Sequence, residues 1–450
     1  MTYKLPMYKL SQYNITIDNK DTDELIIFNT LRRSIFKSRN RVINRFIRAY
    51  DDVIDTEDMN DTIDEAIQLL INKEILVPNE YNERKVADMI FHEMVYSNSL
   101  MTATIIPTEK CNFQCIYCYE NGAQKSMTQE TAQNLIRYFS ETLPKFQRVF
   151  INWYGGEPLM EMNMIRFIMS ELQQICRSSK TVLLSSVTTN GSLLTPDNMN
   201  CLLDVGVNMF QLSLDGNEAT HNRQRPLKLG GNSYRTIMNN LQGIRDLIKK
   251  RRFEIVIRVN ITDEVNFLMP EILDEYEQNF ANNPRFSMSF QWIRDWGGDI
   301  NKNLPTAAHI TKKWINEATK RGIHCNDILT NNCGLEYCDT CRKHGYFFDI
   351  DGSMKKCSIA IYDENYQDVN TVGYVNKMGK AILDKRKEAE WISREEPEKK
   401  CNSCPVYPMC MSVNCSLSTQ IKKTRNCMPI KGIISDLLEN RASFAKYDFI

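Results

Sequence analysis

The chain has 450 residues, of which 42% are apolar and 25% are charged, a composition typical of globular proteins with two or three domains. Lysine plus arginine and aspartate plus glutamate number 56 each, so the net charge is zero, which excludes a general nucleic-acid binder that needs a basic excess. The sequence shows no secretory signal and no run of roughly 18 apolar residues that would cross a membrane. We therefore expect a cytoplasmic protein that binds neither nucleic acid nor membrane.

Residues 1–97 contain no cysteine and form the first expected unit. Helical patterns alternate there with short apolar runs in "DELIIFNTLRRSIF" (23–36), "MNDTIDEAIQLLINKEILVP" (59–78) and "RKVADMIFHEMVY" (84–96). In the second segment, Asp61 or Thr62 can cap a helix that places Ile63, Ile67, Leu70 and Ile71 on one face, and "KEILVP" is typical of a short strand. A helix followed by strands predicts a small winged-helix-like module, with a plain helical cap as the alternative.

Residues 98–310 form the second expected unit, with an alternating strand and helix pattern. Strands are predicted over 103–107, 148–153, 181–188, 208–214, 254–261 and 285–293. Helices are predicted over 128–142, 160–178, 196–204, 234–251 and 269–279. This α/β alternation indicates a parallel sheet built from right-handed crossovers. The loops "TEKCNFQC", "YGGEP", "TTNG" and "SLDG" follow strands, and ligands gather at the carboxyl ends of parallel strands.

The first of these loops holds three cysteines, Cys111, Cys115 and Cys118. Disulfides seldom persist in the cytosol, so metal ligation is the better interpretation of the 15 cysteines in the chain. A structural zinc site would need a fourth ligand, and the nearest downstream histidine is His221. Three thiolates on a cubane cluster instead leave one iron open, and soft thiolates suit iron–sulfur clusters. The loop therefore favours an iron–sulfur cluster with an accessible iron.

The spacing Cys-x3-Cys-x2-Cys, with an aromatic residue before the third cysteine, resembles that of the radical S-adenosylmethionine (radical SAM) enzymes. This resemblance implies a partial (β/α)6 TIM-like barrel over 98–310. It also implies a [4Fe–4S] cluster whose open iron binds the amino and carboxylate groups of S-adenosylmethionine. Reductive cleavage would then give a 5′-deoxyadenosyl radical that abstracts hydrogen, chemistry that belongs to the cofactors while the protein positions them.

The resemblance also implies which residues bind the cofactor. The glycine-rich motif supplies Gly155, Gly156 and Glu157, and Tyr117 is expected near the adenine, with packing beneath the loop as its alternative role. Ends of later strands supply the remaining expected contacts, with turn or capping roles as the alternatives: Asn190 in "TTNG", Ser213 in "SLDG" and Arg225 in "HNRQRP", with Asn260 as a weaker candidate. The pattern indicates no catalytic base.

Residues 311–450 contain a second group of cysteines, in which Gly352-x4-Cys357 precedes Cys401-x2-Cys404. This group resembles the SPASM extension, a cysteine-rich domain that holds two auxiliary [4Fe–4S] clusters, for three clusters in all. By resemblance, one cluster takes Cys357, Cys415 and cysteines from the group Cys333, Cys338 and Cys341. The other cluster takes Cys401, Cys404, Cys410 and Cys427.

Three points about these cysteines stay open. Four residues separate Cys410 from Cys415, where the family has three, which affects the placement of Cys415. If only one cysteine of the first group binds, that cluster also has an open iron. A zinc ribbon built on the Cys-x2-Cys pairs is the alternative. Cys176, Cys201 and Cys325 are expected to be small buried apolar residues.

The combined resemblance implies a maturase that crosslinks a ribosomally made precursor peptide, of the sactipeptide or ranthipeptide type. A thioether is favoured and a carbon–carbon bond comes next. The module at 1–97 would capture a leader peptide, which commonly adds a strand to a sheet edge, and flavodoxin or ferredoxin would donate electrons.

Two alternatives remain. The first is oxidation of Cys or Ser to formylglycine, as in anaerobic sulfatase maturases. It is disfavoured because Ser358, rather than an acidic residue, follows Cys357, and because a long segment precedes the first cysteine motif. The second alternative is a non-catalytic metal scaffold or electron carrier, which would not need the three loops "YGGEP", "TTNG" and "SLDG".

Overall fold

A computed structural model of the chain describes residues 8–49, 61–120, 124–293, 307–325, 338–394, 396–413 and 415–424, together with residues 427, 431, 434, 435 and 438. The side chains of 61–64 and 307–309 are not among the described ones, so the caps proposed at Asp61 and Thr62 and the placement of Ile63 lie outside the described residues. Cys333 lies outside them as well.

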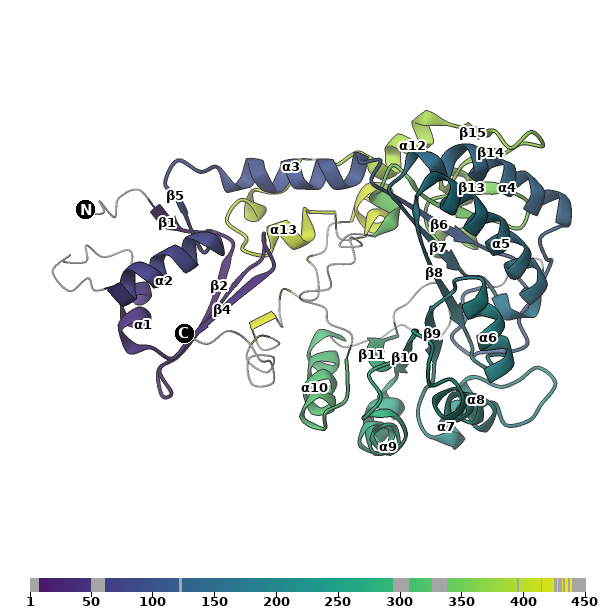
Figure 1. Cartoon of the computed structure of the whole chain (residues 1–450), viewed down its shortest axis with the longest axis horizontal. Coiled ribbons are helices and arrows are strands. Elements are labelled where there is room, and N and C mark those ends of the chain that lie inside the picture. The colour runs from purple at the N-terminus through teal and green to yellow at the C-terminus, as the bar shows by residue number, and fades with distance from the viewer. Residues whose placement is uncertain are drawn as a thin grey trace.

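The largest element is a ten-stranded sheet with the order β11-β10-β9-β8-β7-β6-β12-β13-β14-β15. Its first six strands in sequence pair in parallel, which confirms the predicted parallel α/β core (Figure 1). These strands are β6 (Leu100–Ile105), β7 (Arg148–Trp153), β8 (Val182–Thr189), β9 (Met209–Ser213), β10 (Glu254–Ile261) and β11 (Phe286–Trp292). Because all six carboxyl ends lie along one edge, the loops after them meet there.

Helices cover the outer face of this sheet. They are α4 (Gln129–Thr142), α5 (Met162–Ser179), α6 (Pro196–Asp204), α7 (Glu218–Gln224), α8 (Ser233–Leu247), α9 (Asp263–Phe280) and α10 (Ala307–Lys320). Thr128, Thr195 and Thr262 accept hydrogen bonds from backbone N–H groups in the first turns of α4, α6 and α9, which explains where these helices begin. The sequence pattern missed α7, a short helix directly after the "SLDG" loop.

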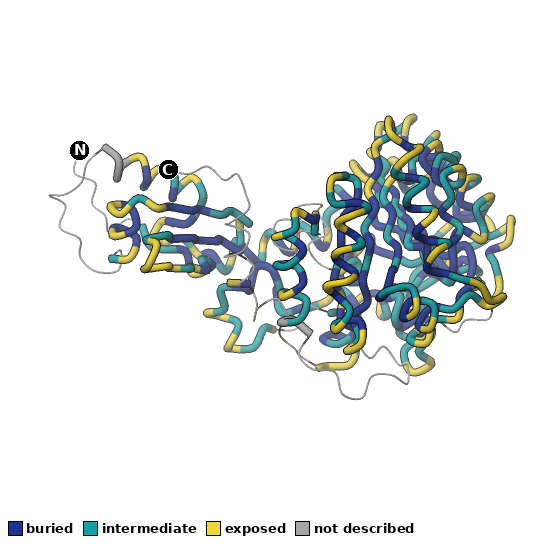
Figure 2. Tube along the Cα trace, turned by 90° about the horizontal axis from the view of Figure 1, so that it is seen from below, coloured by how far each residue is buried: buried dark blue, intermediate teal, exposed yellow. Residues whose placement is uncertain are grey.

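The strands have two different faces. On β10, Ile255, Ile257 and Val259 are buried against the helices, as the dark tube of Figure 2 shows for the sheet as a whole. The alternate positions, such as Val256 and Arg258, are half-buried and face the inside of the partial barrel. Apolar residues thus stabilise the outer layer, while polar residues line the inner face near the strand ends.

The cysteine-rich region extends the same sheet. Strand β12 (Gly345–Phe348) pairs in parallel with β6, and antiparallel pairing continues through β13 (Ser353–Lys355), β14 (Thr371–Val375) and β15 (Ala381–Leu383). Short helices complete the region: α11 (Gln367–Asn370), α12 (Lys385–Ile392) and α13 (Tyr407–Cys410). The loop after β13 contains Cys357, and Ser358 and Ile359 of this loop line the same cavity as the cysteines after β6.

In its described residues, the N-terminal part contains two small sheets and three helices. Strands β2 (Asn14–Asn19), β3 (Glu24–Asn29) and β4 (Ser34–Ser38) form an antiparallel meander, and β1 (Tyr8–Leu10) pairs with β5 (Leu76–Pro78). The helices are α1 (Arg41–Arg48), α2 (Asp61–Asn72) and α3 (Glu83–Tyr96). Over 23–36, where the sequence showed helical patterns and short apolar runs without deciding between them, β3 and β4 form a hairpin. Leu25, Ile27 and Phe36 pack on α1 and α2 with strand periodicity.

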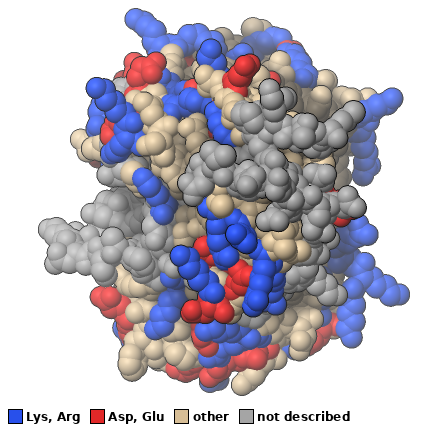
Figure 3. Space-filling view, turned by 90° about the vertical axis from the view of Figure 1, so that its left-hand side faces the viewer, with Lys and Arg blue, Asp and Glu red and all other residues tan. Residues whose placement is uncertain are grey.

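This N-terminal part packs on the cysteine-rich region. Phe28 of β3 shares a buried cluster with Val406 and Met409, and Phe91 of α3 shares another with Tyr407. Figure 1 shows α3 running from the N-terminal sheets toward the barrel, with α13 beside it. Viewed from the N-terminal side, Figure 3 shows lysine and arginine side chains intermingled with acidic ones. Within the part of the chain that the structure covers, no helix is long and apolar enough to cross a membrane.

Candidate active site and cysteine-lined cavities

The loop after β6 carries the first three cysteines, Cys111, Cys115 and Cys118. Backbone hydrogen bonds fix the loop: Gln114 N donates to Pro226 O at 2.9 Å, and Ile116 N donates to Gln224 O at 3.0 Å. The segment after α7 therefore holds the cysteine loop against the ends of the strands. Cys111 and Cys115 are half-buried and Cys118 is exposed.

Burial raises the pKa of the Cys111 thiol to about 11. Burial also raises the pKa of Cys115, although the nearby Arg225 opposes this shift. The protein alone thus favours the protonated thiols, and stabilising three thiolates here requires the positive charge of a bound metal centre. The residues present fit an iron–sulfur cluster, whose irons would supply that charge.

The glycines of "YGGEP" allow this loop to pack against the cysteine loop. A Cβ atom on Gly155, where φ is +120°, would lie 2.5 Å from Thr108 O, and one on Gly156 would lie 2.4 Å from Lys110 O. Gly156 N donates to Thr108 O at 3.2 Å, and Glu157 N donates to Lys110 O at 2.8 Å. These two positions need glycine because any side chain would push the two loops apart.

Glu157 is fully buried and does not reach the cavity described below. Its carboxylate accepts hydrogen bonds from Thr189 Oγ1 at 2.7 Å, Asn190 N at 2.7 Å and Leu159 N at 3.0 Å. It therefore joins "YGGEP" to "TTNG" inside the protein. Asn190 in turn donates from Nδ2 to Asn112 Oδ1 at 2.7 Å and lies 3.9 Å from Cys111 Sγ.

A buried polar network closes the other side of the site. Asp215 of "SLDG" is fully buried, accepts from the Tyr117 hydroxyl and pairs with Arg225 at 3.6 Å. Asn260 donates from its backbone N to Asp215 Oδ1 at 2.7 Å and from Nδ2 to the Tyr117 hydroxyl at 3.2 Å. Arg225 also donates to the Tyr117 hydroxyl. The network fixes Tyr117 between the cysteine loop and the ends of β9 and β10.

These groups line a cavity of about 700 Å³, here called the barrel cavity. It brings together most of the residues predicted from the sequence: Cys111, Cys115, Cys118, Tyr117, Gly155, Gly156, Asn190, Ser213, Arg225 and Asn260. Of the predicted set for this site, only Glu157 is missing from its wall. Ser358 and Ile359, which directly follow Cys357, complete the wall on the side of the cysteine-rich region. The barrel cavity has the size of a site for a cofactor and part of a substrate.

Several residues of this wall were not predicted. Asp215 does not line the cavity but holds Tyr117 and Arg225, and it could have been found because it stands in the "SLDG" motif two positions after Ser213. Glu120 lines the cavity; burial raises its pKa to about 7, against an opposing hydrogen bond with Tyr154. Gln211 and Arg258 lie on the inner faces of β9 and β10. No motif marks these last three residues, and only the strand alternation could have placed two of them inside.

The second group of cysteines forms a separate, smaller cavity. Cys401, Cys404, Cys410 and Cys427 line a space of about 40 Å³, here called the auxiliary cavity, with Lys400 and Tyr407 beside them. In the described ranges, no three His, Cys, Asp or Glu side chains converge on the position of a single metal ion. A zinc ion would hold its sulfur ligands at about 2.3 Å, whereas ligands of a cubane cluster stand farther apart.

Cys338, Cys341, Cys357 and Cys415 lie near one another between these two cavities. Burial, reinforced by nearby Cys338 and Cys415, raises the pKa of Cys357 to about 12. Burial likewise raises the pKa of Cys341 to about 12, again with Cys338 close by. Of the three cysteines outside these sets, Cys176 is buried as expected, whereas Cys201 and Cys325 are half-buried.

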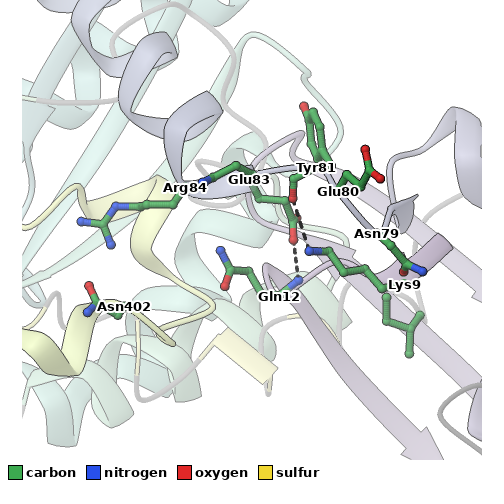
Figure 4. A pocket seen from close by; sticks show the side chains of 10 residues that line it. Lys9, Gln12, Asn79, Glu80, Tyr81, Glu83, Arg84 and Asn402 are labelled. Atoms are coloured by element: carbon green, nitrogen blue, oxygen red, sulfur yellow. Dashed lines mark hydrogen bonds between the residues drawn. The ribbon is translucent and has the colours of Figure 1, made fainter. Parts of the chain in front are cut away.

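A third cavity, of about 450 Å³, lies on the N-terminal part beside β1, β5 and the first turn of α3 (Figure 4). It is called the N-terminal groove below. Glu83 forms its floor, accepting hydrogen bonds from Ser11 and from Gln12 N at 3.0 Å. Lys9 donates to Tyr81 O at 3.3 Å. Arg84 stacks on Tyr407 at 3.5 Å, and Asn402 also lines the groove, so the groove abuts the auxiliary cavity.

Comparisons with known proteins agree with this geometry. Residues 105–276 match the model of the Radical SAM superfamily. Among curated proteins, the radical SAM cyclopropyl synthase TigE of Paramaledivibacter caminithermalis is 23% identical over 304 residues, which cover 60% of this chain and 61% of TigE. The chain spans about three fifths of the length of the first curated relatives that it matches.

Two solved structures are similar in fold. Native anSMEcpe with bound AdoMet and Kp18Cys peptide aligns with a TM-score of 0.57 at 15% identity, covering 76% of this chain and 97% of that one. Streptococcus suis SuiB bound to its precursor peptide SuiA aligns with a TM-score of 0.50 at 13% identity, covering 90% and 95%. At this identity, the likeness concerns the fold.

The central part of the chain is therefore a radical SAM domain, a domain of enzymes that use S-adenosylmethionine. This domain implies a [4Fe–4S] cluster and S-adenosylmethionine as cofactors, and the barrel cavity contains the three cysteines that would hold the cluster.

Proposed function

We propose that this protein is a radical SAM peptide maturase that installs a crosslink in a ribosomally made precursor peptide. One observation carries the proposal: the barrel cavity is lined both by Cys111, Cys115 and Cys118 and by Ser358, the residue after Cys357. A substrate in this cavity would contact both a radical-generating cofactor and the edge of the cysteine-rich region. Removal of hydrogen and removal of an electron could then occur at one bound residue.

The cysteines would hold three [4Fe–4S] clusters. Cys111, Cys115 and Cys118 would hold the cluster that binds S-adenosylmethionine, which supplies a hydrogen-abstracting radical when bound and reduced. Cys357 and Cys415, with members of the group Cys333, Cys338 and Cys341, would hold the first auxiliary cluster. The four cysteines of the auxiliary cavity would hold the second.

Residues of the barrel cavity would orient the cofactor. Tyr117 is held by Asp215 and Arg225, so its ring is fixed for packing against an adenine. Arg225 and Ser213 would contact the carboxylate or the ribose, and Asn190 would fix the cysteine loop through Asn112. Gly155 and Gly156 serve by allowing the two loops to pack closely rather than by touching the ligand.

Residues 1–97 would serve as the leader-binding module, 98–310 as the radical SAM barrel and 311–450 as the SPASM domain. The N-terminal groove supports the leader assignment, because it is polar, open to solvent and adjacent to the short β1–β5 sheet, whose strands offer edges for an extended peptide (Figure 4). An acidic carrier such as flavodoxin or ferredoxin would supply electrons.

A thioether is the favoured bond and a carbon–carbon bond comes next. The relative TigE, a cyclopropyl synthase by name, supports keeping the carbon–carbon bond in consideration. Both products are oxidative, since each loses two hydrogens from the peptide.

Mass spectrometry of candidate precursor peptides incubated anaerobically with the reconstituted protein, S-adenosylmethionine and a reductant tests the proposal. Loss of two hydrogens with retention of every sulfur supports a crosslink. Loss of a cysteine sulfur would indicate formylglycine formation instead. Release of 5′-deoxyadenosine without any peptide change across peptides encoded next to this protein would contradict the maturase assignment.

A further inference from the structure

Two arginines line the barrel cavity, and they differ in how their charge is balanced. Arg225 is 7% exposed and pairs with the fully buried Asp215 at 3.6 Å. Arg258, on β10, donates from Nε to the neutral side-chain oxygen of Asn260 at 2.8 Å. Among the residues that the structure covers, no carboxylate forms an ion pair with Arg258. One guanidinium therefore has an internal carboxylate partner, whereas the other has only a neutral partner among the described residues.

Arg258, the arginine whose charge has no carboxylate partner among the described residues, lies inside the barrel. The register of the sheet places it beside Ser213 of β9 and Ser289 of β11, both on the inner face. It lies one pleat below Asn260, and thus deeper than the network that fixes Tyr117 at the strand ends. Its charge is half-buried and faces a cavity large enough for a ligand.

A half-buried cation without a counter-ion is stable only where water or a ligand solvates it. A guanidinium group offers parallel N–H donors that match the two oxygens of a carboxylate. Asp215 cannot serve, because it already accepts from Tyr117 and Asn260 and pairs with Arg225. Glu120 also lines the cavity, but the described residues show no ion pair between it and Arg258. The free donors of Arg258 are therefore available to a bound carboxylate.

We propose that Arg258 binds a carboxylate of the substrate peptide, an Asp or Glu side chain presented in the barrel cavity. This inference rests on the proposed function and adds to it that the modified segment is acidic. The carboxylate of S-adenosylmethionine is the competing anion. Arg225 is better placed for it, because Arg225 donates to the Tyr117 hydroxyl and lies 5.9 Å from the Phe113 ring, both in the cysteine loop, and the cofactor must reach the cluster at that loop.

The test uses the reconstituted holoenzyme saturated with S-adenosylmethionine and two capped tripeptides, acetyl-Gly-Asp-Gly-amide and acetyl-Gly-Asn-Gly-amide. Isothermal titration calorimetry measures the Kd of each. We expect the Asp tripeptide to bind at least about tenfold more tightly, a preference that Arg258→Gln removes and Arg258→Lys keeps in part. Arg252→Gln, which changes an exposed arginine before β10, should leave the preference intact.

Three results would overturn the inference: no preference in the unmodified protein, a preference that survives in Arg258→Gln, or weaker binding of S-adenosylmethionine by Arg258→Gln with the tripeptide ratio unchanged. The melting temperature shows that each variant is folded, and the iron content shows that it holds its clusters. Failure of the proposed function is recognised separately, because it would appear as release of 5′-deoxyadenosine by the reduced, unmodified holoenzyme without any mass change in the candidate precursor peptides.

Discussion

The barrel cavity and the auxiliary cavity are both lined by cysteines, but they differ in the space beside those cysteines. The barrel cavity encloses about 700 Å³ and is also lined by two arginines, three tyrosines and two glycines. The auxiliary cavity encloses about 40 Å³, and Val406, Tyr407 and two lysines line it beside the cysteines. The first has room for a cofactor and a substrate residue, whereas the second has no room for a substrate residue beside a cluster. Cysteine content alone thus does not mark a reaction site, and the neighbouring side chains do.

The largest expected effect comes from substituting a cysteine of the barrel cavity. Cys118→Ala should abolish cleavage of S-adenosylmethionine, because two thiolates cannot hold a cluster with one open iron at this loop. The measurement is 5′-deoxyadenosine by liquid chromatography and mass spectrometry. Cys201→Ala, at a half-buried cysteine outside both cavities, is the control and should keep full cleavage. Full cleavage by Cys118→Ala would mean that the barrel cavity does not hold the reactive cluster.

A second variant tests the auxiliary cavity. Cys404→Ala should remove about four of about twelve irons and abolish peptide product, while some uncoupled cleavage of S-adenosylmethionine remains. Iron analysis and product mass spectrometry read the two effects in the same sample. If Cys404→Ala lost cofactor cleavage as completely as Cys118→Ala, the two cavities would not be functionally distinct.

Breaking the buried network beside the barrel cavity should have a smaller effect than removing a cluster cysteine. Asp215→Asn leaves Arg225 buried without its anion, so we expect a loss of about 3 to 5 kcal/mol in stability together with weaker binding of S-adenosylmethionine. Thermal melting and equilibrium dialysis measure these changes. Asp204→Asn breaks an exposed pair with Arg251 at 2.6 Å and should cost less than about 1 kcal/mol. Equal losses of stability in the two variants would show that burial of the network does not increase its contribution to stability.

The N-terminal groove predicts the smallest effect. Tyr81→Ala removes a lining side chain but leaves the contacts of Glu83 intact, so leader binding should weaken by about tenfold while cofactor cleavage is unchanged. Fluorescence anisotropy of labelled candidate leader peptides measures the binding. Lys20→Ala, in an exposed turn outside the groove, is the control. An equal loss of peptide binding and cofactor cleavage would favour a purely structural N-terminal part.

The barrel was more predictable from the sequence than the N-terminal part, for physical reasons. Strands β7 and β10 begin and end where the apolar runs predicted, because parallel strands buried by helices on one face have strong local patterns. In 23–36, apolar residues at consecutive positions fit either a helix or a hairpin, and the packing of Phe28 on Met409 of the distant C-terminal region decides for the hairpin. The sequence does not show that contact.

The residues of the candidate site were predictable from the sequence to the same extent, where the signal was local. Motif residues such as Cys111, Asn190 and Ser213 were found because their spacing is local, and the structure brings them to one cavity. Glu157 was expected at the ligand but is used inside the protein, since three hydrogen-bond donors surround it. Arg258 and Glu120 belong to no recognised motif. Both line the barrel cavity, and their place in its wall depends on the folded barrel.

The most direct test of the account is electron–nuclear double resonance on the reduced protein with S-adenosylmethionine labelled with 15N in its amino group. We predict a coupling between the label and a cluster in the unmodified protein that persists in Cys404→Ala and vanishes in Cys118→Ala. An absence of coupling in the unmodified protein, or a coupling lost in Cys404→Ala and kept in Cys118→Ala, would contradict the assignment of the barrel cavity.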